Sequence, residues 1–301
     1  YIRKAHITPD IDKEQAAFDC EIEARQAGSY TVAVHAVLGS IHLRTKKTVA
    51  CQRGLNKVQV ILPVRNPSLW SPDSPSLYET RLTLLRGETA VDAVETYFGM
   101  RKIGRGVYGG SGHEYILLNN KPIYLRGALH QSFNPKGIYT HPDDDYIRND
   151  YAKAKEFGLN FIRIHIKIDE PRALYWADRL GYLCWGEFPN WGLDHSNPAV
   201  LGRMLPEWLT VLERDFNHPA LIMWTPFNET PRSQDPWLLR NIYLTTKSID
   251  PTRPVHDVSG FRHVQTDIYS VHNYEGDPDK FAALFEPFKT GGAPWIFDPD
   301  Y

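Results

Sequence analysis

The residues with the clearest catalytic potential are Asn228 and Glu229, an amide beside a carboxylate. They follow the apolar run Leu221–Trp224, which begins after a helix-like segment and an Asn-His-Pro turn. A continuous apolar run of this kind is typical of a strand buried on both faces, as in a parallel sheet. In a (β/α) barrel, polar residues at the carboxyl end of such a strand project into the active-site mouth. Glu229 is therefore the first candidate for a catalytic acid, and a solvated glutamate that opens a loop is the alternative.

Polar side chains close each of six successive predicted strands, and Glu229 is one of them. In chain order they are His130 and Gln131, Arg163 and His165, Glu187 and Asn190, Asn228 and Glu229, Asp257, and His272, Asn273 and Tyr274. Because unpaired buried polar groups cost roughly 1–3 kcal/mol each, their repeated placement at one end of the strands indicates a site. Taken singly, His165 or Asp257 can equally be a structural residue with satisfied hydrogen bonds, and Arg163 can be an ion-pair partner of the site carboxylates.

A carboxylate beside an amide, in a chain rich in aromatic residues, favours glycoside hydrolysis. In that reaction a carboxylic acid protonates the leaving oxygen, and a second carboxylate attacks the anomeric carbon or activates water. The neighbouring amide can donate a hydrogen bond to a sugar hydroxyl. Aromatic residues form 12% of the chain, with 8 Trp and 16 Tyr, which suits the stacking of sugar rings, although large cores explain them equally. Trp191, after the third strand, is a candidate stacking platform or a core residue.

Other classes of site and partner have weaker support. His130, His165 and His272 could ligate a metal, as in barrel hydrolases, but no His-x-His pair ends the first strand. Gly104-Arg105-Gly106 does not open a helix, which disfavours nucleotide binding, and we expect no cofactor. The formal charge of -2 and the scattered basic residues exclude a nucleic-acid footprint. No apolar run is long enough to span a membrane. The compartment cannot be inferred from the sequence.

The first hundred residues predict a β domain, and residues 1–106 are expected to form an immunoglobulin-like sandwich. The predicted strands are Ala16–Arg25, Tyr30–Leu38, Ile41–Ala50, Asn56–Leu62, Leu77–Arg86 and Ala90–Phe98. Pro67–Pro75 cannot pair as a central strand because proline lacks the N–H group, so Trp70 should anchor it on a neighbour. Cys20 and Cys51 could pair across the sandwich, but two buried free thiols are the favoured interpretation.

From Val107 the pattern changes to strands that alternate with helices, which predicts a parallel sheet. The glycine-rich segment Arg105–Gly112 is predicted to be a linker or a connecting turn. The expected strands are Ile123–Leu129, Phe161–Ile166, Tyr182–Phe188, the run ending at Glu229, Val255–Ser259 and Ile268–Tyr274. The expected helices are Asp143–Phe157, Pro171–Leu180, Val200–Phe216, Asp235–Ile249 and Asp279–Phe285. A complete (β/α)8 barrel needs roughly 250 residues. Residues 107–301 are therefore expected to form an incomplete TIM barrel, truncated at the C-terminus.

Several motifs resemble those of glycoside hydrolase family 2, the group of β-galactosidases, β-glucuronidases and β-mannosidases. Asn217-His218-Pro219, followed by Trp224 and Asn228-Glu229, is similar to the family's acid/base segment. The other matching segments are Ser68–Pro72, Phe98–Arg101, Asn120–Gly127, Lys155–Arg163, Asp178–Gly181 and Asp250–Val255. Together these segments are spread over nearly the whole chain.

The resemblance implies a sandwich followed by a (β/α)8 barrel and a retaining double displacement on β-linked glycosides, with β-galactosides preferred. Glu229 would be the acid/base, Asn228 would hold the sugar 2-hydroxyl, and Tyr274 would hydrogen-bond the nucleophile. The family's nucleophile is a Glu on the seventh strand. We do not find it here, since Asp298 matches only superficially, and the resemblance places it beyond Tyr301. The chain would then be an inactive fragment.

The remaining residues of the predicted carbohydrate site are His130, His165, Arg163, Trp191, Asp257 and His272. Two segments depart from the family pattern. Arg163-Ile164-His165 is one residue shorter than the family's Arg-x-Ser-His string, and the His after the first strand is shifted at His130. Two other classes of protein stay open. One is a non-catalytic carbohydrate-binding barrel protein, and the other is a metal-dependent barrel hydrolase.

Overall fold

A computed structural model describes residues 1–110 and 112–291 of the chain. The chain divides into two compact units. The first comprises residues 1–163, 169–184 and 213–222, and the second comprises residues 164–168, 185–212 and 223–301. The first unit contains the sandwich together with the amino-terminal parts of the βα region. The second unit contains Asn228 and Glu229.

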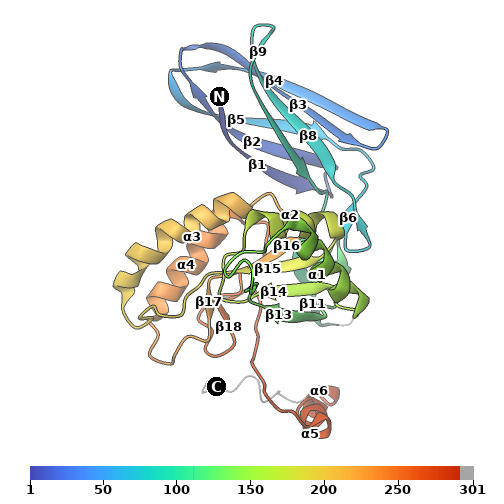
Figure 1. Ribbon diagram of the computed structural model, residues 1–301, viewed down its shortest axis with the longest axis vertical. Coiled ribbons are helices and arrows are strands. Elements are labelled where there is room, and N and C mark those ends of the chain that lie inside the picture. Colours follow the sequence, from blue (N-terminus) through green and yellow to red (C-terminus); the bar gives the residue numbers. More distant parts are fainter. Residues whose placement is uncertain (111, 292–301) are drawn as a thin grey trace. The chain divides into compact units, whose positions relative to one another are not determined.

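The sandwich has two antiparallel sheets, as the alternating sequence predicts (Figure 1). One sheet has the order β1-β2-β5, formed by Ile2–Asp10, Gln15–Ala24 and Gly54–Pro63. The other has the order β4-β3-β8-β9, formed by Ile41–Cys51, Gly28–Leu38, Tyr78–Arg86 and Thr89–Phe98. Strand β1 is absent from the strands predicted from sequence, because Lys4, His6 and Thr8 weaken its alternation. The other six strands match their predicted ranges within two residues.

Alternate residues of both sheets face one core, where Phe18, Val34 and Leu82 are almost completely buried. Phe18 meets Phe98 edge to face, and Tyr78 stacks on Phe98. Burying an apolar side chain of this size contributes about 1.5–3 kcal/mol, so this core holds the two sheets together. Cys20, Cys51 and Cys184 are all free and buried, which confirms the interpretation of Cys20 and Cys51 as unpaired thiols.

Asp178, whose carboxylate is fully buried in the first unit, contacts residues of the sandwich and of the segment that contains Asn217-His218-Pro219. His218 Nδ1 lies 2.5 Å from Asp178 Oδ2, and the Tyr97 hydroxyl donates to the same oxygen. The backbone N–H of Ala220 donates to Oδ1. Trp70, which is also fully buried, donates its indole N–H to the Asp178 carbonyl. Trp70 is therefore the anchor of its proline-rich segment, as predicted.

In the glycine-rich segment predicted as a linker or connecting turn, residues 105–107 belong instead to a strand, whereas Gly109 and Gly110 lie in a turn, as predicted. Strand β10 (Ile103–Val107) pairs antiparallel with β11 (Glu114–Leu118), which also pairs with β12 (Lys121–Pro122). Arg105 and Val107 alternate with glycines that lack side chains, and this hides the period-two pattern. The domain boundary predicted between residues 106 and 107 lies within β10.

The following strands alternate with helices as the sequence indicates. The strands are β13 (Gly127–His130), β14 (Phe161–Ile164), β15 (Leu183–Glu187) and β16 (Leu221–Thr225), and their order in the sheet is β13-β14-β15-β16. The helices are α1 (Asp144–Glu156), α2 (Pro171–Leu180), the short η1 (Pro198–Val200), α3 (Leu201–Asp215) and α4 (Pro236–Ile249). A helix connects each strand to the next neighbour, as in βαβ units. No closed barrel is seen in residues 1–110 and 112–291.

Local signals explain the ends of these helices. Asp143 and Asp235 cap α1 and α4 with side-chain oxygens that accept backbone N–H groups. Gly181 ends α2 in the left-handed conformation with φ 66°. Trp208 of α3 donates to the Thr246 hydroxyl of α4 at 2.8 Å, and the two helices lie side by side in Figure 1. In the described residues, no helix has the length and apolar character needed to cross a membrane.

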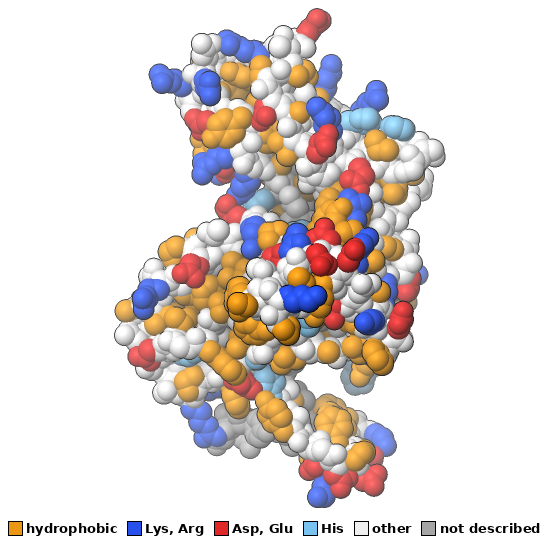
Figure 2. All heavy atoms as spheres, in the orientation of Figure 1, with side chains coloured by type: hydrophobic (Ala, Val, Ile, Leu, Met, Phe, Trp, Pro, Cys, Tyr) orange, Lys and Arg blue, Asp and Glu red, His pale blue; other side chains and the backbone are white. Residues whose placement is uncertain are grey.

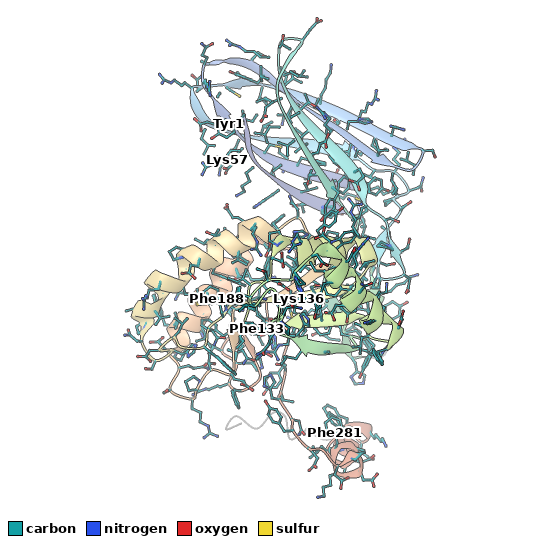
Figure 3. All side chains as sticks on the ribbon, in the orientation of Figure 1. Tyr1, Lys57, Phe133, Lys136, Phe188 and Phe281 are labelled. Atoms are coloured by element: carbon teal, nitrogen blue, oxygen red, sulfur yellow. The ribbon has the colours of Figure 1, made fainter. Side chains whose placement is uncertain are left out.

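The fifth predicted strand forms only in part, and the sixth does not form. Trp224 and Val255 form an isolated parallel bridge, and β17 (Phe227–Asn228) pairs parallel with β18 (Val258–Ser259). Residues 268–274 are not a strand, so that prediction was wrong. A strand needs backbone partners on a neighbouring strand, whereas here the backbone N–H groups of Ile268 and Ser270 donate to the side chains of Thr266 and His263. The helix predicted at Asp279–Phe285 is observed as α5 (Pro278–Ala283), and the short α6 (Glu286–Lys289) follows the predicted range. Charged side chains of both signs are interspersed over the face shown in Figure 2.

Candidate functional site

The side chain of Asn190 holds the backbone of Asn228, the residue before Glu229. Asn190 forms two hydrogen bonds with it: Nδ2 donates to the Asn228 carbonyl at 3.0 Å, and Oδ1 accepts the Asn228 N–H at 3.0 Å. Asn190 Nδ2 also lies 3.1 Å from His195 Nε2. On the other side, the Glu229 N–H donates to the Ser259 carbonyl at 3.1 Å. Both asparagines are completely buried, so this peptide has a rigid position.

Glu229 leaves the strand in the left-handed region of the backbone, with φ 48°. This conformation is rare for a residue with a side chain and is common at functional sites. Glu229 Oε1 lies 2.6 Å from His272 Nδ1 and accepts a hydrogen bond from the Tyr274 hydroxyl at 3.0 Å. Oε2 lies 3.4 Å from Asn228 Nδ2. The structure thus brings together four residues that the sequence predicts as site residues.

The electrostatics of Glu229 favour its ionised form in this state. Partial burial raises the pKa of the Glu229 carboxyl, but the hydrogen bonds with His272, Tyr274 and Asn228 outweigh it, so the pKa lies below its usual range. Burial lowers the pKa of His195, which lies beside Asn190, and it outweighs the hydrogen bond with Asn190 and the charge of Asp194, which both act to raise that pKa. At neutral pH the site therefore presents a carboxylate held by a ring of hydrogen-bonding groups.

Two further predicted residues of the second unit contact each other. Trp191 is 54% exposed, and its ring meets that of His165 edge to face at a centroid distance of 5.6 Å. Exposure of so large an apolar surface favours the stacking role over the core role. His165 is buried.

Asp257 is fully buried, and both of its oxygens accept hydrogen bonds from its own loop. Oδ2 accepts from the N–H groups of Val264 and Gln265, while Oδ1 accepts from the Val258 N–H and lies 2.6 Å from His263 Nδ1. These contacts hold the loop that follows β18. A direct contact of Asp257 with substrate stays a prediction.

His130 and Arg163 belong to the first unit. His130 lies between Asp150 and Ser132, with Nε2 3.1 Å from the Asp150 carboxylate and Nδ1 3.1 Å from the Ser132 hydroxyl. Arg163 is partly buried on β14. His130, His165 and His272 have separate neighbours, and among the described residues no group of three or more His, Cys, Asp or Glu side chains is arranged to hold a metal ion. Substrate contacts of His130 and Arg163 stay predictions.

Sequence reasoning missed two features that support the site. Ser259 was not a candidate, although it follows Asp257 at the period-two spacing of a strand and thus shares its face. Glu187 was noted only as a strand end, but its carboxylate accepts the N–H of Ile166, whose φ of 43° is strained for a β-branched residue. Asp298, the superficial candidate for the second carboxylate, lies outside the described residues.

The chain matches two family models, one for each part. Residues 1–101 match the model described as "Glycosyl hydrolases family 2", and residues 112–296 match "Glycosyl hydrolases family 2, TIM barrel domain". Among curated relatives, a beta-galactosidase of Leuconostoc mesenteroides subsp. mesenteroides is 29% identical over 76% of this chain and 22% of its own length. A putative beta-glucuronidase of Formosa agariphila is 29% identical over 82% of this chain and 23% of its own length.

Solved structures agree on the fold. The beta-glucuronidase of Parabacteroides merdae superposes with a TM-score of 0.76 at 21% identity, covering 98% of this chain and 39% of that one. A family 2 member from Bacteroides cellulosilyticus gives a TM-score of 0.74 at 22% identity, covering 94% of this chain and 38% of that one. This chain therefore spans less than a quarter of the two curated relatives and about two fifths of these structures. Since a family model matches more than half of its residues, the chain belongs to glycosyl hydrolases family 2.

Proposed function

We propose that the protein containing this chain is a retaining β-glycosidase that acts on β-galactosides and that Glu229 is its acid/base. The observation that carries the proposal is the Glu229 carboxyl itself. It lies at the end of a buried strand and is held by His272 and Tyr274, while within residues 1–110 and 112–291 its Oε2 has only a long contact of 3.4 Å with Asn228 Nδ2. Family membership and the names of relatives with β-glycosidase activity support the reaction class.

In the first step of the proposed reaction, protonated Glu229 gives its proton to the glycosidic oxygen while a second carboxylate attacks the anomeric carbon. In the second step ionised Glu229 removes a proton from water as the water oxygen attacks the anomeric carbon, which breaks the bond to the second carboxylate and releases the sugar. The second carboxylate should stand about 5–5.5 Å from Glu229. The negative charge of the second carboxylate would raise the pKa of Glu229 before the first step. Once the sugar is bonded to that carboxylate its charge is gone, and the pKa of Glu229 would fall again. One carboxyl can therefore act first as an acid and then as a base.

The remaining predicted site residues have roles within the same proposal. We assign Asn228 to the sugar 2-hydroxyl and Trp191 to stacking on a sugar face, with His165 supporting the Trp191 ring. Tyr274 would hydrogen-bond the second carboxylate in addition to Glu229. The substrate is a carbohydrate, and no metal or organic cofactor takes part in either step.

The test is the replacement of Glu229 in the protein that contains this chain. Glu229→Gln should reduce turnover of alkyl β-galactosides far more than turnover of β-galactosides with acidic aryl leaving groups, which need little protonation. Added azide should restore turnover of the aryl substrate and give a β-galactosyl azide, because azide attacks without a general base. Parallel assays with β-glucuronides examine the sugar preference. If Glu229→Gln reduced turnover of the alkyl and aryl substrates equally, and azide restored none of it, Glu229 would not be the acid/base.

A further inference from the structure

The two oxygens of the Glu229 carboxyl have unequal surroundings. Oε1 lies 2.6 Å from His272 Nδ1 and 3.0 Å from the Tyr274 hydroxyl. Oε2 has only the contact of 3.4 Å with Asn228 Nδ2 among the hydrogen bonds described here. An oxygen that accepts two hydrogen bonds holds its negative charge more strongly and binds a proton less readily. A proton on this carboxyl should therefore reside on Oε2.

The ring of His272 is itself oriented by a second residue. Its Nε2 lies 3.1 Å from the hydroxyl of Ser259, a buried residue on β18. A neutral imidazole carries one N–H donor and one acceptor nitrogen. When Nδ1–H donates to Glu229, Nε2 accepts, and the Ser259 hydroxyl is the group that can donate to it. Ser259 thus selects the tautomer that Glu229 requires.

A glycine provides the space for this ring. Gly260 has φ +71°, and a β-carbon placed on it would lie 2.7 Å from the Cγ and Cδ2 atoms of His272. Separations this short do not occur between a real Cβ and its neighbours, so the ring packs against Gly260 only because that residue lacks a side chain. The Gly260 N–H is held by the Ser270 hydroxyl, which lies 2.7 Å from His256 Nε2. The position of the ring is therefore set from several sides.

We propose that His272 is a positioning residue for Glu229: with its tautomer set by Ser259, it occupies Oε1 so that the proton is transferred through Oε2. This inference rests on the proposed function, and it replaces the substrate-binding role that the sequence suggested for His272. Tyr274 is the other titratable group that contacts the same oxygen. The lowered pKa of Glu229 agrees with hydrogen bonds that stabilise its ionised form.

The tautomer can be measured in the 301-residue chain without any activity. In protein with ¹⁵N-labelled histidine, two-bond ¹⁵N–¹H correlation at neutral pH should show His272 protonated on Nδ1, with its signals identified by their loss in His272→Gln. Ser259→Ala should mix the two tautomers or favour the other one. Ser248→Ala is the matched control, since this hydroxyl donates to the Thr245 carbonyl on α4. Protonation of His272 on Nε2 in the wild type, or no effect of Ser259→Ala, would overturn the proposal.

The second test uses kinetics of the protein that contains the chain. His272→Gln should lower kcat/KM for substrates with poor leaving groups by roughly 10- to 100-fold. The basic limb of the pH profile should move to higher pH, because removal of a donor to the carboxylate raises its pKa. Gly260→Ala should act in the same direction by displacing the ring. A rise in KM with an unchanged pH profile would instead mean that His272 binds substrate, and the proposal would fail.

The two tests separate this inference from the function on which it rests. A wild-type protein that hydrolyses none of the β-glycosides would refute the proposed function, whereas the tautomer of His272 would still be measured in the chain. An active wild type with an Nε2-protonated His272 would refute the inference alone.

Discussion

Asn190 holds the peptide of Asn228 by two hydrogen bonds of 3.0 Å, one to its N–H and one to its carbonyl. The two residues are 38 positions apart, and both are completely buried. The side-chain amide of Asn190 thus continues the sheet as a neighbouring strand would. It fixes the residue that precedes Glu229, and through it the direction in which the Glu229 side chain leaves the strand.

The variant Asn190→Ala should therefore be strongly destabilised. It leaves the buried N–H and carbonyl of Asn228 without these partners, at roughly 1–3 kcal/mol for each group. Urea unfolding should show the loss, and activity should fall with it because Glu229 loses its support. Asn241→Ala is the matched control, since that amide donates to the Trp237 carbonyl at the surface of α4. If Asn190→Ala lost no more stability than Asn241→Ala, the two hydrogen bonds of Asn190 would not be what holds the Asn228 peptide.

A buried ion pair should make stability depend on pH in the acid range. Burial raises the pKa of Asp250, but the charge of Arg253 and hydrogen bonds from Thr252 and Trp224 outweigh it and lower the pKa from 3.8 to about 2. Because the folded pKa is depressed, the stabilisation is present above the unfolded value and is lost as pH falls from about 4 towards 2. Its size is about 2 kcal/mol.

Urea unfolding at a series of pH values measures this stabilisation. Asp250→Asn should be less stable than the wild type at pH 6, because it removes one charged partner of the buried ion pair with Arg253, which costs about 3–5 kcal/mol. Its stability should also vary less between pH 4 and pH 2. An Asp250→Asn variant with the same acid-range slope as the wild type would show that another carboxylate is responsible.

Gly181 should not tolerate a side chain. Its φ is +66°, and a β-carbon there would lie 2.5 Å from the carbonyl oxygen of Pro72. We expect Gly181→Ala to destabilise the first unit by at least about 1–2 kcal/mol from backbone strain alone. Gly202→Ala is the control, because Gly202 lies in α3 with nothing within 4 Å of the added carbon. That variant should be neutral or more stable by about 0.5–1 kcal/mol. Thermal unfolding of both proteins decides between these outcomes.

Trp191 provides a test of sugar stacking. Trp191→Ala should raise KM about 3- to 10-fold, as expected when an aromatic contact of about 0.5–1.5 kcal/mol is lost. The melting temperature should change little, since the ring is 54% exposed. Trp237→Ala, at an equally exposed residue of α4, controls for the loss of a surface tryptophan. Similar KM values in the two variants would assign Trp191 no part in binding.

The sequence by itself determined the elements whose signals are local. Alternation at period two predicted six of the seven sandwich strands, since successive side chains of a strand with one buried face alternate between apolar and polar. Asp143, Asp235 and Gly181 marked helix ends because capping acts over a single turn. The position of Asn228 and Glu229 after a buried apolar run was also visible, because the run and the polar pair are adjacent in the chain.

Tertiary structure alone decided what surrounds Glu229. His272 lies 43 positions away and Asn190 contacts Asn228 across 38, and no local pattern encodes such pairings. It also decided which segments became strands. The weakly patterned β10 is a strand because β11 offers it backbone partners, whereas residues 268–274 are not a strand, since the N–H groups of Ile268 and Ser270 bond to side chains instead. Strand formation and site geometry both depend on partners that are distant in sequence, and the fold alone brings them within hydrogen-bonding distance.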